Sequence, residues 1–224
     1  MKTSLLLSLQ GKPRRPLVDP RGPYALAVLK AEPLAYWRLN EFGGPQTFDA
    51  TRHGRPAAYE EGAAFYLEGP ASPAFSGHAA INRAVHFVGG RLTAPLPLPG
   101  EQYSVELWFW NGLPPGLRGV TGYLFAWGDR LAIGGTNGPA GRLVLSTAAG
   151  AETLIGPTPM PLKRWTHLVL ARDRRRVSLY VNGTLEAAGE APPGDPAQAP
   201  RLVLGGDEER TATFEGKLDE IAVY

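Results

Sequence analysis

Acidic and aromatic side chains alternate along one apolar stretch in a way that suits sugar recognition. In the stretch Tyr103 to Trp110 (YSVELWFW), alternate positions hold Glu106, Trp108 and Trp110. Residues two apart share one face of a β-strand. Indole rings stack on sugar rings, and polar neighbours bind the hydroxyl groups. Aromatic side chains also fill β-sandwich cores. The candidate ligand-binding residues are Glu106, Trp108, Trp110, Trp127 and Tyr180.

The carboxylates are not spaced for catalysis on one strand. Glycoside hydrolysis needs two carboxyl groups about 5–9.5 Å apart across the scissile bond. Glu106 alternates with tryptophans, while Asp219 and Glu220 are adjacent and would point to opposite faces of a strand. The sequence has no G-x-S-x-G motif. We therefore expect a protein that is not an enzyme, with no catalytic residues. A glycoside hydrolase with carboxyl groups from separate strands is the alternative.

Trp165 to Gly183 (WTHLVLARDRRRVSLYVNG) predicts a long antiparallel hairpin. Two runs of alternating apolar residues flank a charged turn, and Asn182-Gly183 is a tight-turn dipeptide. We expect the basic turn Arg172 to Arg176 to be solvated and not to bind phosphate. We expect His167 to pack beside Trp165 without a charged partner.

Four stretches, in order along the chain, resemble one family. W-x-H with a strand ending in Y-V-N-G is similar to the central hairpin of concanavalin A-like, laminin-G-like jelly rolls. Pro33 to Glu41 resembles the first strand of that family, Tyr103 to Trp110 an inner strand, and Gly216 to Tyr224 the last strand. The resemblance covers roughly residues 24–224. It implies an all-β, two-sheet antiparallel jelly-roll sandwich with the hairpin at its centre. It also implies a carbohydrate or glycoprotein ligand and an extracellular or surface location.

The resemblance also suggests a calcium site. First and last strands are often neighbours in this fold, so Glu41, Asp49 and Asp219 could supply hard oxygen ligands, which calcium prefers. The segment DATRHG, which begins at Asp49, stands where the family often has D-S-S-G-N-G. Its Arg52 and His53 weaken such a site. The metal candidates are therefore Glu41, Asp49 and Asp219, and ordinary loop carboxylates are the alternative.

Composition supports one β-rich domain. The 224 residues include 28 glycines and 22 prolines, which suit short strands joined by turns. There is no cysteine, so no disulfide framework exists. A net charge of +2 gives no reason to expect nucleic acid, and no apolar run approaches the ~18 residues of a membrane span.

The N-terminal part predicts a linker and one helix. Residues 1–23 read as an extension rich in proline and basic residues, and the apolar run in MKTSLLLSLQ is short for a secretory signal. Tyr24 to Glu32 is rich in helix formers between two prolines. We expect one short helix at the start of a jelly-roll domain that spans residues 24–224.

These observations favour a non-catalytic module that recognises a carbohydrate or glycoconjugate, with calcium as a candidate cofactor. The second hypothesis is a structural or protein-interaction module of a larger surface, secreted or virion-associated assembly. An exposed aromatic patch with converging polar groups would favour the first hypothesis. A hydrophobic patch at a sheet edge would favour the second.

Overall fold

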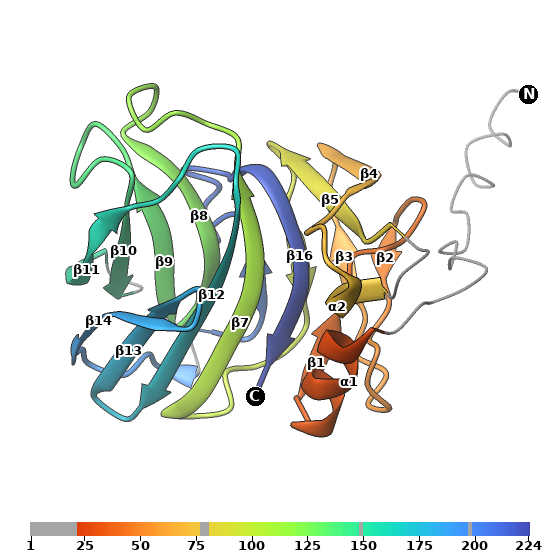
Figure 1. Cartoon of the computed structure of the whole chain (residues 1–224). Helices are drawn as coiled ribbons and strands as arrows, with labels where there is room; N and C mark the ends of the chain where they lie inside the picture. Colours follow the sequence, from red (N-terminus) through yellow and green to blue (C-terminus); the bar gives the residue numbers. More distant parts are fainter. Residues whose placement is uncertain (1–21, 77–80, 148–149, 197–198) are drawn as a thin grey trace, which may run out of the picture.

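The protein is a sandwich of two antiparallel β-sheets (Figure 1). The computed structural model describes residues 22–76, 81–147, 150–196 and 199–224. The predicted all-β sandwich is confirmed. The predicted linker, residues 1–23, lies outside the described residues except for Gly22 and Pro23.

The first sheet has eight strands: seven follow the order β14-β13-β12-β7-β16-β5-β4, and the eighth, β1, pairs with β16. Its longest member, β7, lies between β12 and β16. The strands are β1 (Ala35–Trp37), β4 (Ala63–Glu68), β5 (Arg83–Val88), β7 (Gln102–Asn111), β12 (Trp165–Asp173), β13 (Arg176–Val181), β14 (Thr184–Glu190) and β16 (Glu215–Val223).

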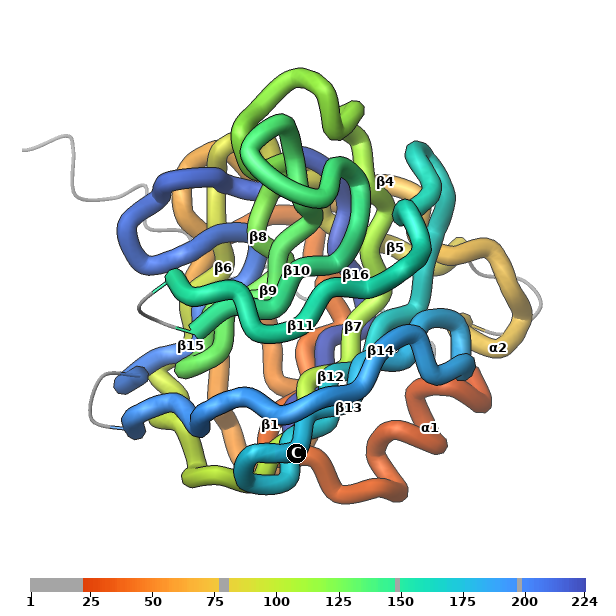
Figure 2. Tube along the Cα trace, turned by 90° about the vertical axis from the view of Figure 1, so that its left-hand side faces the viewer, coloured from red at the N-terminus to blue at the C-terminus, as the bar shows by residue number. Residues whose placement is uncertain are grey.

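The second sheet has the order β11-β10-β9-β8-β15-β6-β3-β2. At one end of the sandwich, the β7–β8 and β9–β10 loops lie together (top of Figure 2), and Asn137 N donates to Gly119 O at 3.0 Å. The strands are β2 (Gln46–Thr47), β3 (Ala57–Tyr59), β6 (Leu92–Ala94), β8 (Val120–Trp127), β9 (Asp129–Gly134), β10 (Arg142–Thr147), β11 (Glu152–Pro159) and β15 (Leu202–Leu204).

Two short helices, α1 (Pro23–Lys30) and α2 (Pro73–Ser76), lie beside β1 at the right of Figure 1. The predicted N-terminal helix is thus confirmed as α1, which begins with the proline that a first turn tolerates. Ala25 and Val28 of α1 are buried against Tyr36 and Ala222. Among the described residues, no helix is long and apolar enough to cross a membrane.

The predicted hairpin forms, but it is not central. Strands β12 and β13 pair in register, and Asn182 and Gly183 turn the chain with φ values of 50° and 79°. That left-handed conformation is what the Asn-Gly pair tolerates. The middle of the sheet is β7 and β16, and β13 is next to the edge strand β14. The prediction of a central hairpin was wrong because local alternation does not specify distant strand partners.

The core lies between the sheets and holds one ion pair that joins them. Arg172 of β12 contacts Asp129 of β9 through two hydrogen bonds of 2.6 Å, and both side chains are almost fully buried. Tyr103 Oη also donates to Asp129 at 2.5 Å. The prediction that the whole turn Arg172 to Arg176 is solvated was therefore wrong for Arg172. Its alternating position on β12 directs it inward, where Asp129 pairs with it.

Candidate functional site

The predicted aromatic surface lies on the outer face of the first sheet, and both helices cover part of it. Phe75 of α2 packs edge-on against Trp108, with ring centroids 5.2 Å apart. Tyr24 of α1 lies 6.2 Å from the same indole. Because these rings occupy the space beside Trp108, that side chain is packed within the protein.

Glu106 is held by three side chains. It accepts hydrogen bonds from Tyr24 Oη at 2.6 Å and Tyr224 Oη at 3.1 Å, and its Oε1 lies 2.9 Å from His167 Nε2. Burial by itself would raise the pKa of Glu106, but the bonds from His167, Tyr24 and Tyr224 outweigh burial and lower it. His167 thus has the charged partner that the sequence did not reveal. The two residues are diagonal neighbours on adjacent strands.

Trp110 and Tyr180 lie on the same outer face and are half-buried. The Lys217 ammonium lies 5.3 Å from the centre of the Trp110 ring, so a cation already occupies part of that face. Trp165 is the cross-strand partner of Trp110. Tyr180 pairs with Val169 and Leu185, two strands away from Trp110. Trp110 and Tyr180 therefore lie apart on this face, each beside a different described neighbour.

Trp127 belongs to the core. Its side chain is 1% exposed, its Nε1 donates to Leu96 O at 2.8 Å, and its ring packs against Tyr103. The expectation that Trp127 offers a stacking face is corrected by this burial. Only an edge of the residue reaches the pocket on the second sheet described below.

The carboxylate oxygens of Glu41 and Asp49 accept hydrogen bonds from neighbouring groups of the protein. Glu41 is buried and accepts from Thr47 Oγ1 at 2.5 Å, Phe48 N at 2.8 Å and Tyr59 Oη at 3.0 Å. Burial raises its pKa, although these bonds oppose the shift. Asp49 accepts from the backbone N–H groups of Tyr36, Thr51 and Arg55. Glu41 and Asp49 are thus held in place by hydrogen-bond donors of the protein itself.

Asp219 contacts the segment before β5. Its Oδ2 accepts from Asn82 Nδ2 at 2.6 Å, and its buried Oδ1 has no hydrogen-bond partner among the residues that the structure describes. Burial, and next the charge of Glu220, raise the pKa of Asp219. Within the described ranges, no group of three or more His, Cys, Asp or Glu side chains is arranged to hold a metal ion. The structure therefore does not assemble Glu41, Asp49 and Asp219 as a metal-binding set.

Glu220 links the first and last strands of the first sheet. Arg38, just after β1, contacts Glu220 at 3.1 Å, and Tyr36 of β1 donates to the same carboxylate. The register of β16 shifts between Asp219 and Ala222, and Glu220 has φ of 49°. Strand alternation is broken at this bulge, and both adjacent carboxylates are buried.

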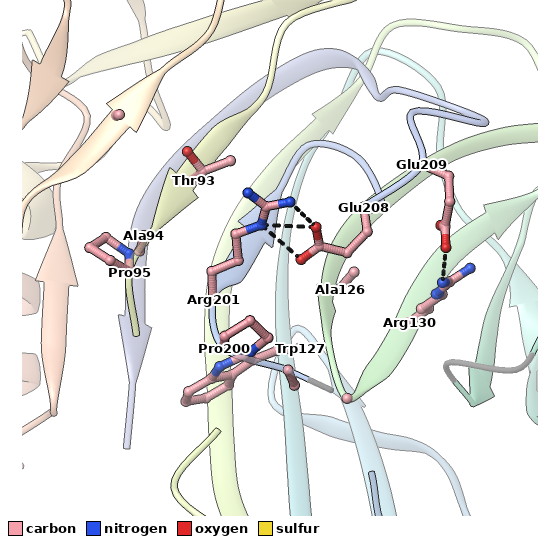
Figure 3. A pocket seen from close by; sticks show the side chains of 13 residues that line it. Thr93, Ala94, Pro95, Ala126, Trp127, Arg130, Pro200, Arg201, Glu208 and Glu209 are labelled. Atoms are coloured by element: carbon pink, nitrogen blue, oxygen red, sulfur yellow. Dashed lines mark hydrogen bonds and ion pairs between the residues drawn. The ribbon is translucent and has the colours of Figure 1, made fainter. Parts of the chain in front are cut away.

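The outer face of the second sheet carries an open pocket of about 770 Å³ (Figure 3). Its floor is one row of residues across five strands, and these residues alternate with core residues such as Phe125 and Leu131. All but one are small or β-branched, which leaves space above the sheet. The row is Ala58, Thr93, Val203, Ala126 and Arg130, and all of these except the fully buried Val203 line the pocket.

Two ion pairs form the polar wall of this pocket. Arg201 Nε donates to both Glu208 oxygens, at 2.9 and 3.1 Å, and Arg130 Nη2 contacts Glu209 Oε1 at 2.9 Å. Figure 3 shows the two glutamates entering the pocket region from one loop. The pocket thus offers hydrogen-bond donors and acceptors side by side above an apolar floor.

The loop that carries both glutamates is anchored at Asp207. This buried carboxylate accepts from Thr211 N at 2.8 Å and Thr211 Oγ1 at 2.5 Å. Arg91 donates to the carbonyl groups of Asp207 and Glu208, and Glu60 binds Arg91 at 2.7 Å. These bonds fix the backbone, so the positions of Glu208 and Glu209 are built into the fold.

A smaller pocket of about 180 Å³ lies on the same face beside Tyr123, Ala132 and Val144. Strict alternation would place Tyr123 in the core with Phe125 and Trp127. However, the β8–β9 register shifts between Tyr123 and Phe125, so Leu124 and Phe125 are both buried while Tyr123 is half-buried. Sequence reasoning missed Tyr123 and both wall pairs. The Gly205-Gly206 dipeptide predicts a turn just before Asp207, Glu208 and Glu209, and this turn could have pointed to the acidic loop.

Solved structures of several carbohydrate-active or receptor-binding proteins share this fold. Domain 4 of an extracellular arabinanase from Geobacillus stearothermophilus, in complex with arabinotriose, aligns with TM-score 0.57 and 21% identity over 85% of this chain and 90% of that domain. The receptor-binding domain of botulinum neurotoxin type G aligns with TM-score 0.56 and 11% identity over 86% of this chain. A Trypanosoma rangeli sialidase aligns with TM-score 0.57 and 15% identity over 87%.

The chain spans 47% of the neurotoxin domain and 31% of the sialidase. No curated protein matches this sequence. A family model does match residues 89–224, which include β7, β12, β13 and β16, the middle and hairpin of the first sheet. The chain therefore belongs to the concanavalin A-like lectin/glucanases superfamily.

Proposed function

We propose that this protein binds a saccharide in the open pocket of the second sheet. The pocket itself carries the proposal, because it combines a small-residue floor with paired donors and acceptors. Its volume of about 770 Å³ falls within the range of roughly 300–1,000 Å³ that is typical of small-ligand sites. The arabinotriose complex of the arabinanase domain supports the same class of ligand.

We also propose that binding is not followed by hydrolysis. The pocket carboxylates Glu208 and Glu209 are each paired with an arginine, so neither can approach a glycosidic bond without breaking its ion pair. A glycosidase needs one protonated carboxyl as its general acid. Glu106 lies in a network with Tyr24 and His167 on the opposite sheet. Incubation with a panel of neutral polysaccharides should release no reducing ends. Release that disappears in Glu208→Gln would contradict this proposal.

A filled pocket tests the binding site. Thr93 lies on the pocket floor, so Thr93→Trp should occupy the space above β6 and weaken saccharide binding at least tenfold, about 1.4 kcal/mol. Thr158→Trp is the matched control, since Thr158 is an exposed strand residue outside the pocket lining. Glycan-array screening, with and without calcium, identifies the ligand, and titration calorimetry then compares the variants. Equal affinity in both variants would place the ligand elsewhere.

A protein-interaction role is the second candidate. Leu185 of the edge strand β14 is 54% exposed, and Ile155 of the edge strand β11 is 43% exposed. The two edges approach each other, because Thr158 N donates to Glu186 Oε1 at 2.7 Å. Leu185→Lys with Ile155→Lys should abolish any concentration-dependent association in sedimentation runs. A wild-type protein that stays monomeric at every concentration removes self-association from this candidate.

A further inference from the structure

The ion pairs of the pocket contribute little to folding. The side chains of Arg201 and Glu208 are 50% and 31% exposed, and Glu209 is 55% exposed opposite Arg130. Ion pairs with an exposed partner add little to stability, because water competes for the charged groups. Yet the loop that presents both glutamates is fixed through buried Asp207 and Arg91. Since the ion pairs add little to folding, we attribute the fixed position of these carboxylates to the surface that the pocket presents to a ligand.

The charges that line the pocket cancel. Arg130 and Arg201 supply two positive charges, while Glu208 and Glu209 supply two negative charges. The remaining lining residues are uncharged: Ala58, Thr93, Ala94, Pro95, Ala126, Trp127, Gly128, Ala199 and Pro200. Each arginine is paired with a carboxylate, so an incoming anion would meet positive charges that are already neutralised.

Hydroxyl groups suit such a wall better than carboxylates do. A sugar hydroxyl can accept from a guanidinium N–H and at the same time donate to a carboxylate oxygen. A uronate carboxylate only accepts, and it would lie close to Glu208 or Glu209, where like charges repel. Specificity of this kind arises from an element that disfavours the wrong ligand.

We infer that the pocket selects neutral saccharides over acidic ones, and that Glu208 and Glu209 are the residues that determine this preference. The inference rests on the proposed saccharide-binding function and adds the class of its ligand. Repulsion also predicts a salt effect, since the Debye length falls to about 3 Å at 1 M salt. Wild-type discrimination should therefore narrow at high salt.

The test compares neutral oligosaccharides of glucose and galactose with the matching glucuronic and galacturonic acid oligosaccharides. Proteins are the wild type, Glu208→Gln, Glu209→Gln and the double variant. Glutamine keeps the size of glutamate and one acceptor oxygen but removes the negative charge, so each arginine loses its ion pair. The wild type should prefer the neutral member of a pair at least tenfold. The double variant should gain at least tenfold affinity for the acidic member, and each single variant should gain less.

Glu190→Gln is the matched control, because Glu190 forms an exposed pair with Arg175 outside the pocket lining. The ratio of its affinities for the neutral and the acidic oligosaccharide should equal that of the wild type. Thermal melts check that all variants are folded. Wild-type binding of acidic and neutral ligands with equal affinity, or an unchanged ratio in the double variant, overturns this inference and leaves the proposed function standing. Absence of binding to every saccharide by every protein overturns both.

Discussion

Asp129 and Arg130 are neighbours on β9, yet they belong to two different regions of the molecule. Asp129 faces the space between the sheets and pairs with Arg172, and both side chains are at most 1% exposed. Arg130 faces outward and pairs with Glu209, which is 55% exposed. The same pair of chemical groups thus has two uses. The buried pair joins the sheets, whereas the exposed pair shapes a surface for ligands at little cost to folding.

Removing one partner from each ion pair should lower the free energy of unfolding by very different amounts. Asp129→Ala leaves the Arg172 guanidinium buried without its carboxylate, and we expect a loss of about 3–5 kcal/mol in the free energy of unfolding. Glu209→Ala should cost about 0–1 kcal/mol. Urea unfolding of both variants measures the contrast. Similar losses would show that burial does not distinguish the two pairs.

Trp108 tests whether the aromatic face of the first sheet is structural. Trp108→Ala should lower the free energy of unfolding by about 3 kcal/mol, because Phe75 and His167 lose a packed neighbour. Saccharide affinity, measured by calorimetry below the melting transition, should match that of the wild type. A folded variant that no longer binds would return the ligand to the first sheet.

Asp219 should make the stability of the protein depend on pH. Its folded-state pKa is raised above the unfolded value of about 3.9. The folded protein therefore retains a proton that the unfolded chain releases, and stability falls as pH rises from about 4 toward the folded pKa. Asp219→Asn cannot lose a proton. Melting temperatures from pH 4 to 9 should fall less steeply in this variant, and parallel curves would refute the assignment.

Calcium should have the smallest effect. Donor groups occupy the oxygens of Glu41 and Asp49, and a bound cation would require those donors to move. We therefore expect the same melting temperature in millimolar calcium and in chelator, since only a ligand that binds the folded state shifts it. A rise with calcium that disappears in Asp49→Asn, with Asp173→Asn as a control, would restore the predicted metal site.

The sequence by itself determined the β-sandwich, the short N-terminal helix and the Asn182-Gly183 hairpin. Each depends on residues close together in the chain: period-two alternation, a proline-bounded run of helix formers, and a turn dipeptide. Motifs also placed the chain in its family. Local patterns were reliable here because backbone conformation depends mainly on neighbouring residues.

Only the tertiary structure decided which side chains meet. Alternation predicted that Trp108 and Trp110 face outward, but not that α1 and α2 cover part of that face. It could not show that Trp127 and Arg172 face inward, where Leu96 O accepts a hydrogen bond from the Trp127 indole and Asp129 of the other sheet pairs with Arg172. Register shifts at Tyr123 and Glu220 break the strict alternation of buried and exposed residues that the sequence predicts for these strands. The row of residues under the pocket comes from five strands in distant parts of the chain. Its small residues come together only when the strands pair, so the sequence by itself does not predict the pocket.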